Sequence, residues 1–217
     1  MKFSGKPKLF IITGSNGAGK STYKQALLPA EFNTLEIFDG DIFYIKQSTA
    51  FYKINRSSKE SHKLAEEVLE KEFLRLVESS ISQKSNFAYE GHFTGGGAWE
   101  IPKRFKKEGF EINLIFCGLN MLERSIQRVG MRVKKGGFHV TALAIENNYW
   151  GNMEMLDKNF AMFDSVELID TSNLILPIAK LTLGEPVSTI STDKIPGWLK
   201  KGLPVIFKAI DDFNNRK

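Results

Sequence analysis

A glycine-rich loop near the start of the chain carries the residue types that bind phosphate. Residues 14–21 read Gly-Ser-Asn-Gly-Ala-Gly-Lys-Ser and fit the pattern G-x-x-x-x-G-K-[ST] at every fixed position. Lys20 is expected to reach the β- and γ-phosphates of ATP, and Ser21 to ligate Mg²⁺. The alternative is a glycine-rich turn between a strand and a helix that binds no ligand. The expected nucleotide-binding residues are Gly14, Ser15, Asn16, Gly17, Ala18, Gly19, Lys20, Ser21 and Thr22.

Two acidic segments follow expected strands, Asp39-Gly40-Asp41 and Glu90-Gly91-His92. In open α/β sheets, ligands bind beyond the carboxyl ends of the strands. Asp41 is the candidate base for an acceptor hydroxyl, and the alternative is that it caps a helix over 42–47. Glu90 is expected to hold a metal-bound water or a substrate hydroxyl, or else to be an ordinary loop carboxylate. The residues expected at the substrate are Asp39, Asp41, Glu90 and His92.

Three arginines recur at four-residue spacing in the segment 119–135, which is expected to be helical. Arg124, Arg128 and Arg132 would lie near one face of that helix. Because guanidinium groups match phosphate oxygens through paired hydrogen bonds, the helix is a candidate lid over the phosphates. The alternative is an amphipathic surface helix. The expected catalytic residues are Lys20, Asp41, Arg128 and Arg132.

The elements that must position these residues form an α/β pattern. Strands are predicted over 8–13, 34–38, 86–89, 111–117 and 166–170, and long helices over 59–84, 119–135 and 141–157. Such alternation favours a mostly parallel five-stranded sheet with helices on both faces. With a phosphate loop after the first strand, it predicts the P-loop NTPase fold. Two more strands (174–183 and 187–192) and a last helix (203–214) are expected as a small C-terminal extension.

Length and composition limit the class of protein. The 217 residues suit a single domain, with a core over about 8–173 and a peripheral piece over 174–217. The net charge of +5 suits phosphate-bearing substrates. One cysteine excludes an internal disulfide, and no histidine–cysteine cluster has zinc spacing. Neither a signal peptide nor a membrane span is found, so a cytoplasmic protein is expected.

Four segments together match the pattern of one family. They are the phosphate loop, the segments 38–43 and 89–92, and the stretch 128–140, which has two Arg-Val pairs followed by Gly-Gly. Residues 169–172, Ile-Asp-Thr-Ser, match the end of the next strand. The chain thereby resembles the zeta-toxin-like family of P-loop kinases over about residues 8–173.

The resemblance implies an ATP-dependent kinase with Mg²⁺ and a small-molecule acceptor, and it suggests UDP-N-acetylglucosamine, a nucleotide sugar that some family members phosphorylate. It implies phosphate binding by Lys20, Mg²⁺ binding by Ser21, a base at Asp41 and an acidic residue near the acceptor at Glu90. Arg128 or Arg132 would contact phosphate. The family also implies an antitoxin protein as a partner.

Three departures from the family pattern affect these expectations. Phe138 stands where many relatives have histidine, and His92 stands where threonine is usual. Asn147 and Asn148 occupy a helix in which relatives often carry arginines. Loss of an arginine from the γ-phosphate would weaken catalysis, since such arginines supply roughly 10³–10⁵-fold in other systems. Lys134 or Lys135 is a candidate replacement.

Other functions fit part of the pattern. A shikimate-like metabolite kinase also has an Asp-x-Asp after its second strand. A polynucleotide 5′-kinase is compatible with the basic charge, but nucleic-acid binding is disfavoured because no basic motif with interleaved aromatic residues is present. A weakly active nucleotide-binding regulator would explain the missing arginines. A GTPase is disfavoured, because neither Asn-Lys-x-Asp nor Asp-x-x-Gly occurs.

Overall fold

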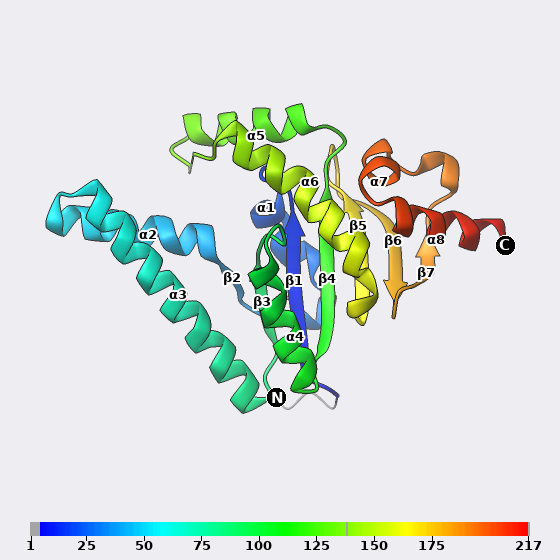
Figure 1. Ribbon diagram of the computed structural model, residues 1–217, viewed down its shortest axis with the longest axis horizontal. Helices are drawn as coiled ribbons and strands as arrows, with labels where there is room; N and C mark the ends of the chain where they lie inside the picture. The colour runs from blue at the N-terminus through cyan, green and yellow to red at the C-terminus, as the bar shows by residue number, and fades with distance from the viewer. Residues whose placement is uncertain (1–4, 138, 217) are drawn as a thin grey trace.

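Strand β1 (Lys8–Gly14) is an interior strand of the sheet and ends at the phosphate loop (Figure 1). The computed structural model describes residues 5–137 and 139–216, and the departure at Phe138 lies outside them. Leu9, Ile11 and Ile12 are completely buried. Their burial follows from the parallel neighbours β3 (Phe87–Glu90) and β4 (Glu111–Gly118) on either side and from helices on both faces.

The five predicted strands are all present and parallel, in the order β2-β3-β1-β4-β5. Strand β2 spans Ile37–Asp39 and β5 spans Ser165–Asp170. β2 starts later than predicted because the chain turns just before it, where Leu35 N donates to Phe32 O. The register pairs Asp39 with Glu90, so the acidic ends of β2 and β3 lie level at one edge of the sheet.

Two further strands join the same sheet in antiparallel orientation. They are β6 (Leu176–Thr182), which pairs with β5, and β7 (Glu185–Thr189), which pairs with β6. The mostly parallel α/β fold is confirmed, but among the described residues the sheet has seven strands, so the predicted count of five is wrong. Pro177 and Pro186 each lie beside a register shift, as expected for a residue that lacks the N–H of a regular ladder.

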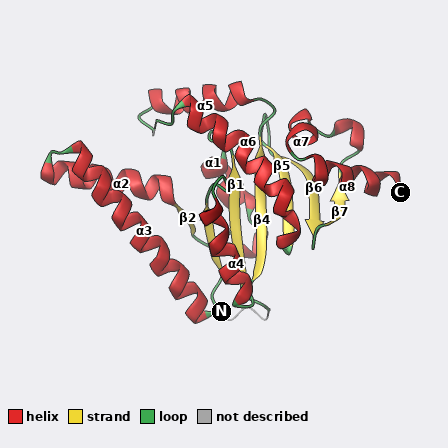
Figure 2. Cartoon of the chain, in the orientation of Figure 1, coloured by secondary structure: helices red, strands yellow, loops and turns green. Residues whose placement is uncertain are grey.

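Helices cover the sheet on both faces (Figures 1 and 2). Figure 1 shows α4 and α6 in front of the sheet, α1 behind it, and α5 across the carboxyl ends of the strands. The α-helices are α1 (Lys20–Leu27), α2 (Gly40–Asn55), α3 (Ser58–Gln83), α4 (Glu100–Lys107), α5 (Leu122–Lys134), α6 (Ala142–Asn159), α7 (Gly197–Gly202) and α8 (Pro204–Asn215). Short 3₁₀ turns span Ala30–Phe32, Gly96–Trp99, Phe160–Met162 and Thr192–Lys194.

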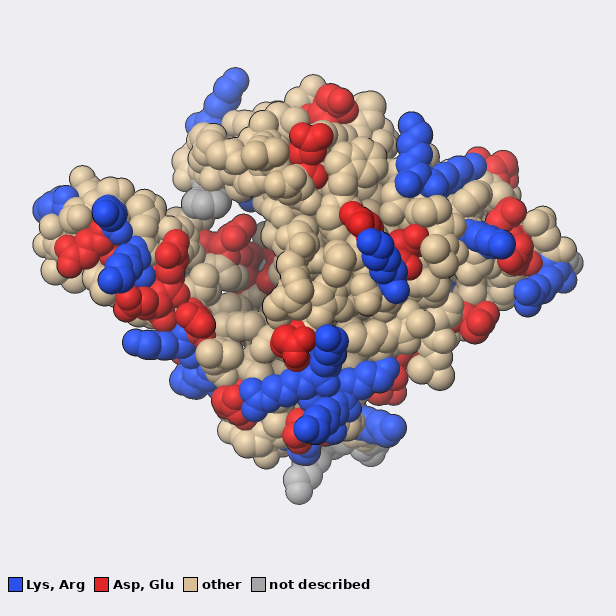
Figure 3. Space-filling view, viewed as in Figure 1, with Lys and Arg blue, Asp and Glu red and all other residues tan. Residues whose placement is uncertain are grey.

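Helices α2 and α3 connect β2 to β3 in the chain, and together they form an arm that projects from the body of the molecule (cyan in Figure 1). The Ser57 hydroxyl caps α3 by accepting from Glu60 N at 3.3 Å. No side chain of α2 is buried, whereas α3 buries Ala65 and Val77. Figure 3 shows a hollow between the arm and the body of the molecule, with acidic side chains inside it.

The C-terminal elements are packed into the core. Trp198 of α7 is buried, and its Nε1 donates to Asp170 Oδ2 at 2.6 Å. The Asp157 carboxylate of α6 accepts from Val205 N and Ile206 N at 3.0 and 2.9 Å. It thereby caps the first turn of α8, which has no side-chain cap of its own. The segment after β5 is therefore fastened to β5 and α6 as well as to the sheet edge.

A Gly118→Ala substitution is expected to destabilise the fold through this contact. A Cβ at Gly118 would lie 2.2 Å from Cζ2 of the Trp198 ring, which its hydrogen bond to Asp170 holds in place. Overpacking of this kind costs about 1–3 kcal/mol, measurable by urea denaturation. Gly130→Ala in α5 is the control, because its Cβ would meet no atom within 4 Å. Equal stability of the two variants would contradict the tight contact.

Candidate active site

The phosphate loop joins β1 to α1 through glycines in left-handed backbone conformations. The φ angle is +136° at Gly14 and +78° at Gly19, values that side-chain-bearing residues rarely adopt. A Cβ at Gly14 would also lie 2.2 Å from the carbonyl oxygen of Cys117. Gly19 is the N-cap of α1 and supplies no side-chain cap, so the N–H groups of Lys20 and Ser21 point toward the place where a phosphate would bind.

Lys20 is folded back onto the loop that precedes it. Its Nζ donates to the carbonyl oxygens of Gly14 and Ser15, both at 3.0 Å, and lies 3.6 Å from Glu90 Oε1. Only 5% of the Lys20 side chain is exposed. A phosphate oxygen is a stronger acceptor for an ammonium group than a neutral carbonyl. The observed position therefore suits a lysine that exchanges loop carbonyls for nucleotide phosphates.

Ser21 stands between two carboxylates. Its Oγ lies 3.0 Å from Asp39 Oδ2 and 2.9 Å from Glu90 Oε2. A hydroxyl has one proton and donates to one acceptor at a time, so one of these close oxygen pairs has no proton between its members. A hard cation would relieve that repulsion, and Mg²⁺ prefers oxygen ligands. The donor set fits the Mg²⁺ expected at Ser21.

The two aspartates after β2 have different surroundings. Asp39 caps α2, because its Oδ1 accepts from Ile42 N at 3.0 Å. The capping role considered for Asp41 is therefore wrong, since α2 begins at Gly40 and not at Ile42. Asp41 lies exposed in the first turn of α2 and has no hydrogen bond or ion pair within the part of the chain that the structure describes. Its carboxylate is available to accept a proton.

A cavity of about 690 Å³, here called the phosphate cavity, brings most of the predicted residues together. Gly14, Ser15 and Ala18 shape the loop but do not line this cavity, and His92 lines another. Lys135, one of the two candidate replacement cations, is on its wall. The predicted residues that line it are Asn16, Gly17, Gly19, Lys20, Ser21, Thr22, Asp39, Asp41, Glu90, Arg128 and Arg132.

The three predicted arginines of α5 have separate positions. Arg128 lines the phosphate cavity, and its guanidinium donates to carbonyl oxygens of the phosphate loop and of the loop after β5 at 2.7–3.2 Å. Arg132 lines the same cavity. Arg124 does not, because its guanidinium donates to Ser172 O at 2.7 Å. Since the acceptors of Arg128 are neutral, its positive charge remains available to attract phosphate.

Two helices hold the phosphate loop through Asn16. The Ser125 hydroxyl of α5 donates to the Asn16 carbonyl oxygen, and Asn148 Nδ2 of α6 donates to Asn16 Oδ1 at 2.8 Å. Asn148 therefore positions the loop from the helix in which the family resemblance implied arginines. Asn147 is exposed and lines neither cavity. Among the described residues, the positive charge on the walls of this cavity comes from Lys20, from Arg128 and Arg132 of α5, and from Lys135 just after that helix.

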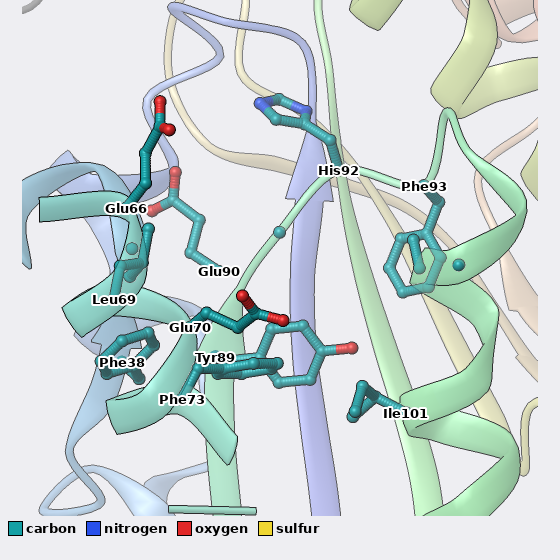
Figure 4. A pocket seen from close by; sticks show the side chains of 14 residues that line it. Phe38, Glu66, Leu69, Glu70, Phe73, Tyr89, Glu90, His92, Phe93 and Ile101 are labelled. Carbon is teal, nitrogen blue, oxygen red and sulfur yellow. The ribbon is translucent and has the colours of Figure 1, made fainter. Parts of the chain in front are cut away.

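A second cavity of about 440 Å³, here called the acceptor cavity, lies between α3, β3 and α4 (Figure 4). Its walls are mainly apolar and include Phe38, Leu69, Phe73, Tyr89, Phe93 and Ile101. Glu90 lines both cavities. A molecule in the acceptor cavity would therefore meet the phosphate cavity at the Glu90 carboxylate.

The environment of the Glu90 carboxylate at this junction disfavours its ionised form. Burial raises its pKa above the ordinary glutamate value, repulsion from Asp39 and Asp41 adds to the increase, and Lys20 and the Ser21 hydrogen bond oppose it. The ionised side chain is therefore held at a net cost in the ligand-free fold.

A Glu90→Gln substitution is expected to raise the melting temperature of the ligand-free protein at about pH 8. A raised pKa means that the protonated form favours folding, and this stability is lost as the pH rises through the folded-state pKa. The neutral amide of the variant keeps this stability at high pH. The difference in melting temperature between the variant and the wild type should therefore disappear at about pH 4, where Glu90 is itself protonated. Thermal unfolding checks this, with the exposed Glu67→Gln as control. A variant that melts below the wild type at both pH values would contradict the net cost.

His92 lies in the acceptor cavity as a neutral ring. Phe93 N can only donate, so the Asn152 atom 2.6 Å from it is Oδ1, and Asn152 Nδ2 faces His92 Nδ1 at 3.0 Å. The ring proton is then on Nε2. Burial, with a smaller effect of the Lys20 charge, lowers the pKa of His92 to about 3. His92 is therefore a hydrogen-bond donor at neutral pH and not a cation.

The model of the zeta toxin family matches residues 1–175 of this chain. The chain belongs to the zeta toxin family. Membership of the zeta toxin family, together with the phosphate loop, makes the protein a P-loop kinase, an ATP-dependent phosphotransferase. Among the described helices, none is long and apolar enough to cross a membrane.

Individual relatives are distant. An uncharacterized protein of Haemophilus influenzae is 26% identical over 142 residues, which are 65% of this chain and 92% of that protein. A structure from the PezAT chromosomal toxin–antitoxin system of Streptococcus pneumoniae has a TM-score of 0.58 at 19% identity, over 97% of this chain and 88% of its own. The AvrRxo1-ORF1:-ORF2 structure with ATP has a TM-score of 0.67 at 14% identity, over 92% and 64%. At these identities the two structures show a shared fold.

Several residues of this zeta toxin family site were missed by sequence reasoning. Ser125 and Asn152 are single polar residues on helices, and no motif marks them. Asn148 was noted as a departure from the family pattern, but its contact with Asn16 was not predicted. Phe73 lies on the apolar face of α3, which is also a wall of the acceptor cavity. The sequence did contain one signal of this cavity: Glu66 and Glu70 place two charges on that otherwise apolar face.

Proposed function

We propose that this protein transfers the γ-phosphoryl group of ATP to a hydroxyl of a small molecule that enters the acceptor cavity. The observation that carries the proposal is the position of Glu90, which lines both cavities. Phosphoryl transfer requires the acceptor oxygen and the γ-phosphate to meet in line. Two cavities that join at one carboxylate suit that requirement.

Cations of the phosphate cavity would bind the phosphates. Lys20 is positioned for the β- and γ-phosphates, and Arg128 and Arg132 of α5 line the same cavity. Ser21, Asp39 and Glu90 would hold Mg²⁺, directly or through water. Bound Mg²⁺ would neutralise the charge that develops on the β- and γ-oxygens.

Asp41 is the proposed base. In the transfer step the acceptor oxygen bonds to the γ-phosphorus, the bond from that phosphorus to the β,γ-bridging oxygen breaks, and ADP leaves. The proton of the acceptor hydroxyl moves to the Asp41 carboxylate, which is exposed to the phosphate cavity. Glu90 would orient the acceptor hydroxyl through its accessible carboxylate.

Acceptor-dependent ADP release tests the proposal. Purified protein with ATP and Mg²⁺ is assayed with UDP-N-acetylglucosamine, the acceptor implied by the family resemblance, and then with a panel of other hydroxyl compounds. Release that depends on an acceptor and is lost in Asp41→Asn supports the kinase. ATP binding without transfer to any acceptor of the panel would contradict it and favour a nucleotide-binding regulator.

A protein inhibitor is a further part of the proposal. The fold resembles a structure from a toxin–antitoxin system, and a kinase that consumes a needed metabolite must be restrained in the cell that makes it. Expression of the wild-type protein is expected to slow growth, and expression of Asp41→Asn is not. Equal growth of the two strains would remove the reason for an antitoxin.

A further inference from the structure

The acceptor cavity carries two negative charges that the phosphoryl transfer step does not use. Glu66 and Glu70 lie on α3 with Leu69 and Phe73, at a spacing that places all four on one face of the helix. Figure 4 shows both carboxylates on the cavity side of α3, with that of Glu70 directed toward the ring of Tyr89. The wall that α3 contributes to the acceptor cavity therefore combines apolar side chains with two carboxylates.

Within the part of the chain that the structure describes, no cation balances these charges. Among the described residues, the walls of the acceptor cavity include neither lysine nor arginine. Glu66 and Glu70 have no ion pair with any side chain that the structure describes, whereas Lys20 partly offsets Glu90 at 3.6 Å. Like charges four residues apart on a helix repel each other and weaken it. A bound cation would relieve this repulsion.

The aromatic walls favour the same charge. The Phe73 ring contacts two others, with its centroid 5.6 Å from that of Phe38 and 5.3 Å from that of Tyr89. The faces of aromatic rings are electron-rich and attract organic cations. Carboxylates beside such rings form a site that is apolar in shape and negative in potential.

Two polar groups inside the cavity remain free to orient a ligand. The Tyr89 hydroxyl has no hydrogen bond to any described residue, and burial raises the pKa of Tyr89, so the group stays protonated. Figure 4 shows this hydroxyl pointing into the cavity. His92 offers its Nε2 proton, since Nδ1 is engaged by Asn152. A few polar groups in an apolar pocket are what fixes the orientation of a small ligand.

We infer that the acceptor of this kinase is a hydroxyl-bearing organic cation with an apolar body, and that a diphosphate group is disfavoured in the acceptor cavity. That the bound molecule is the phosphate acceptor rests on the proposed function. The preference of the cavity for a positive charge does not, because it follows from the residues that line the cavity. It separates the acceptor class from the anionic nucleotide sugar that the family resemblance suggested.

Three probes with one skeleton test the charge preference. They are 2-amino-1-phenylethanol, a cation at neutral pH, 1-phenylethane-1,2-diol, which is neutral, and mandelate, an anion. Each carries a phenyl ring and the same benzylic hydroxyl. Binding to the full chain without ATP is measured by ligand-observed NMR at low salt. The cation is expected to bind about tenfold more tightly than the anion, with the diol between them.

Variants of α3 assign the preference to its carboxylates. In Glu66→Gln/Glu70→Gln the advantage of the cation over the anion should fall to about twofold or less, since the uncharged amides remove most of the attraction. Glu67→Gln is the matched control, because Glu67 is exposed on the same helix and does not line the cavity. Equal or tighter binding of mandelate to the wild-type protein, or no binding by any probe, would overturn the inference.

The kinase assay distinguishes failure of this inference from failure of the proposed function. ADP release that depends on UDP-N-acetylglucosamine and is unchanged in Glu66→Gln/Glu70→Gln would keep the kinase and overturn the cationic acceptor. If the cationic probe binds selectively but no acceptor stimulates ADP release from ATP, the charge preference is kept and the proposed transfer to a small-molecule acceptor is overturned.

Discussion

The Asp41→Asn variant is expected to lose about 10²–10⁴-fold in kcat, the range for a positioned general base. Asparagine has nearly the same shape but cannot take the proton from the acceptor hydroxyl. ATP affinity should change little, because Asp41 is exposed and bonds neither the phosphate loop nor Lys20. Steady-state ADP release with saturating acceptor, together with ATP titration, measures both quantities.

Glu90 is the competing base, and the pH dependence of the rate separates it from Asp41. If Asp41 takes the proton, Glu90→Gln should raise the KM for the acceptor while keeping the acidic limb of the kcat profile. If Asp41→Asn remains active and Glu90→Gln loses that limb, the base is Glu90 and its raised pKa would set the acidic limit. Glu67→Gln should match the wild type in both assays.

The Lys20→Ala variant is expected to lose about 10²–10³-fold in kcat, as when one preorganised donor to a developing charge is removed. The Lys20 ammonium is nearly enclosed and lies against the loop carbonyls. Its charge therefore acts on the transferred group in surroundings where water screens little. Single-turnover transfer from labelled ATP measures the loss.

Lys46→Ala is the control for this substitution, because Lys46 is exposed on α2 and lines neither cavity. Thermal unfolding of both variants shows whether the loop still folds without the two carbonyl contacts of Lys20. A folded Lys20→Ala protein that transfers phosphate at the wild-type rate would contradict the assigned role of the phosphate loop.

The sequence predicted the parts of the site that local patterns encode. The phosphate loop is one continuous segment whose glycines need left-handed backbone angles, so its residues identify it without the rest of the fold. Asp39 and Glu90 were found because each directly follows a strand, and the ends of parallel strands meet at one edge. Arg128 and Arg132 were found from their four-residue spacing on one helix face, and the family resemblance supported them.

The parts that depend on distant contacts were not predicted. The C-terminal strands were expected outside the five-stranded sheet because a hairpin pattern does not say which edge it joins. Which of Asp39 and Asp41 caps α2 depends on where that helix begins, and a helix start is uncertain by one or two residues. The acceptor cavity is lined by residues of α3, β3 and α4, which are separate in the sequence, so no single segment of the sequence predicts it.

The projecting arm joins the base to a wall of the acceptor cavity. Asp41 lies in the first turn of α2, and α2 is connected through one short turn to α3, whose Leu69 and Phe73 line that cavity. A molecule that fills the cavity therefore contacts the same arm that carries the proton acceptor, whereas a single water molecule is too small to fill the cavity. Idle hydrolysis of ATP should consequently be slow until an acceptor arrives, which would spare the cell's energy supply while the enzyme waits.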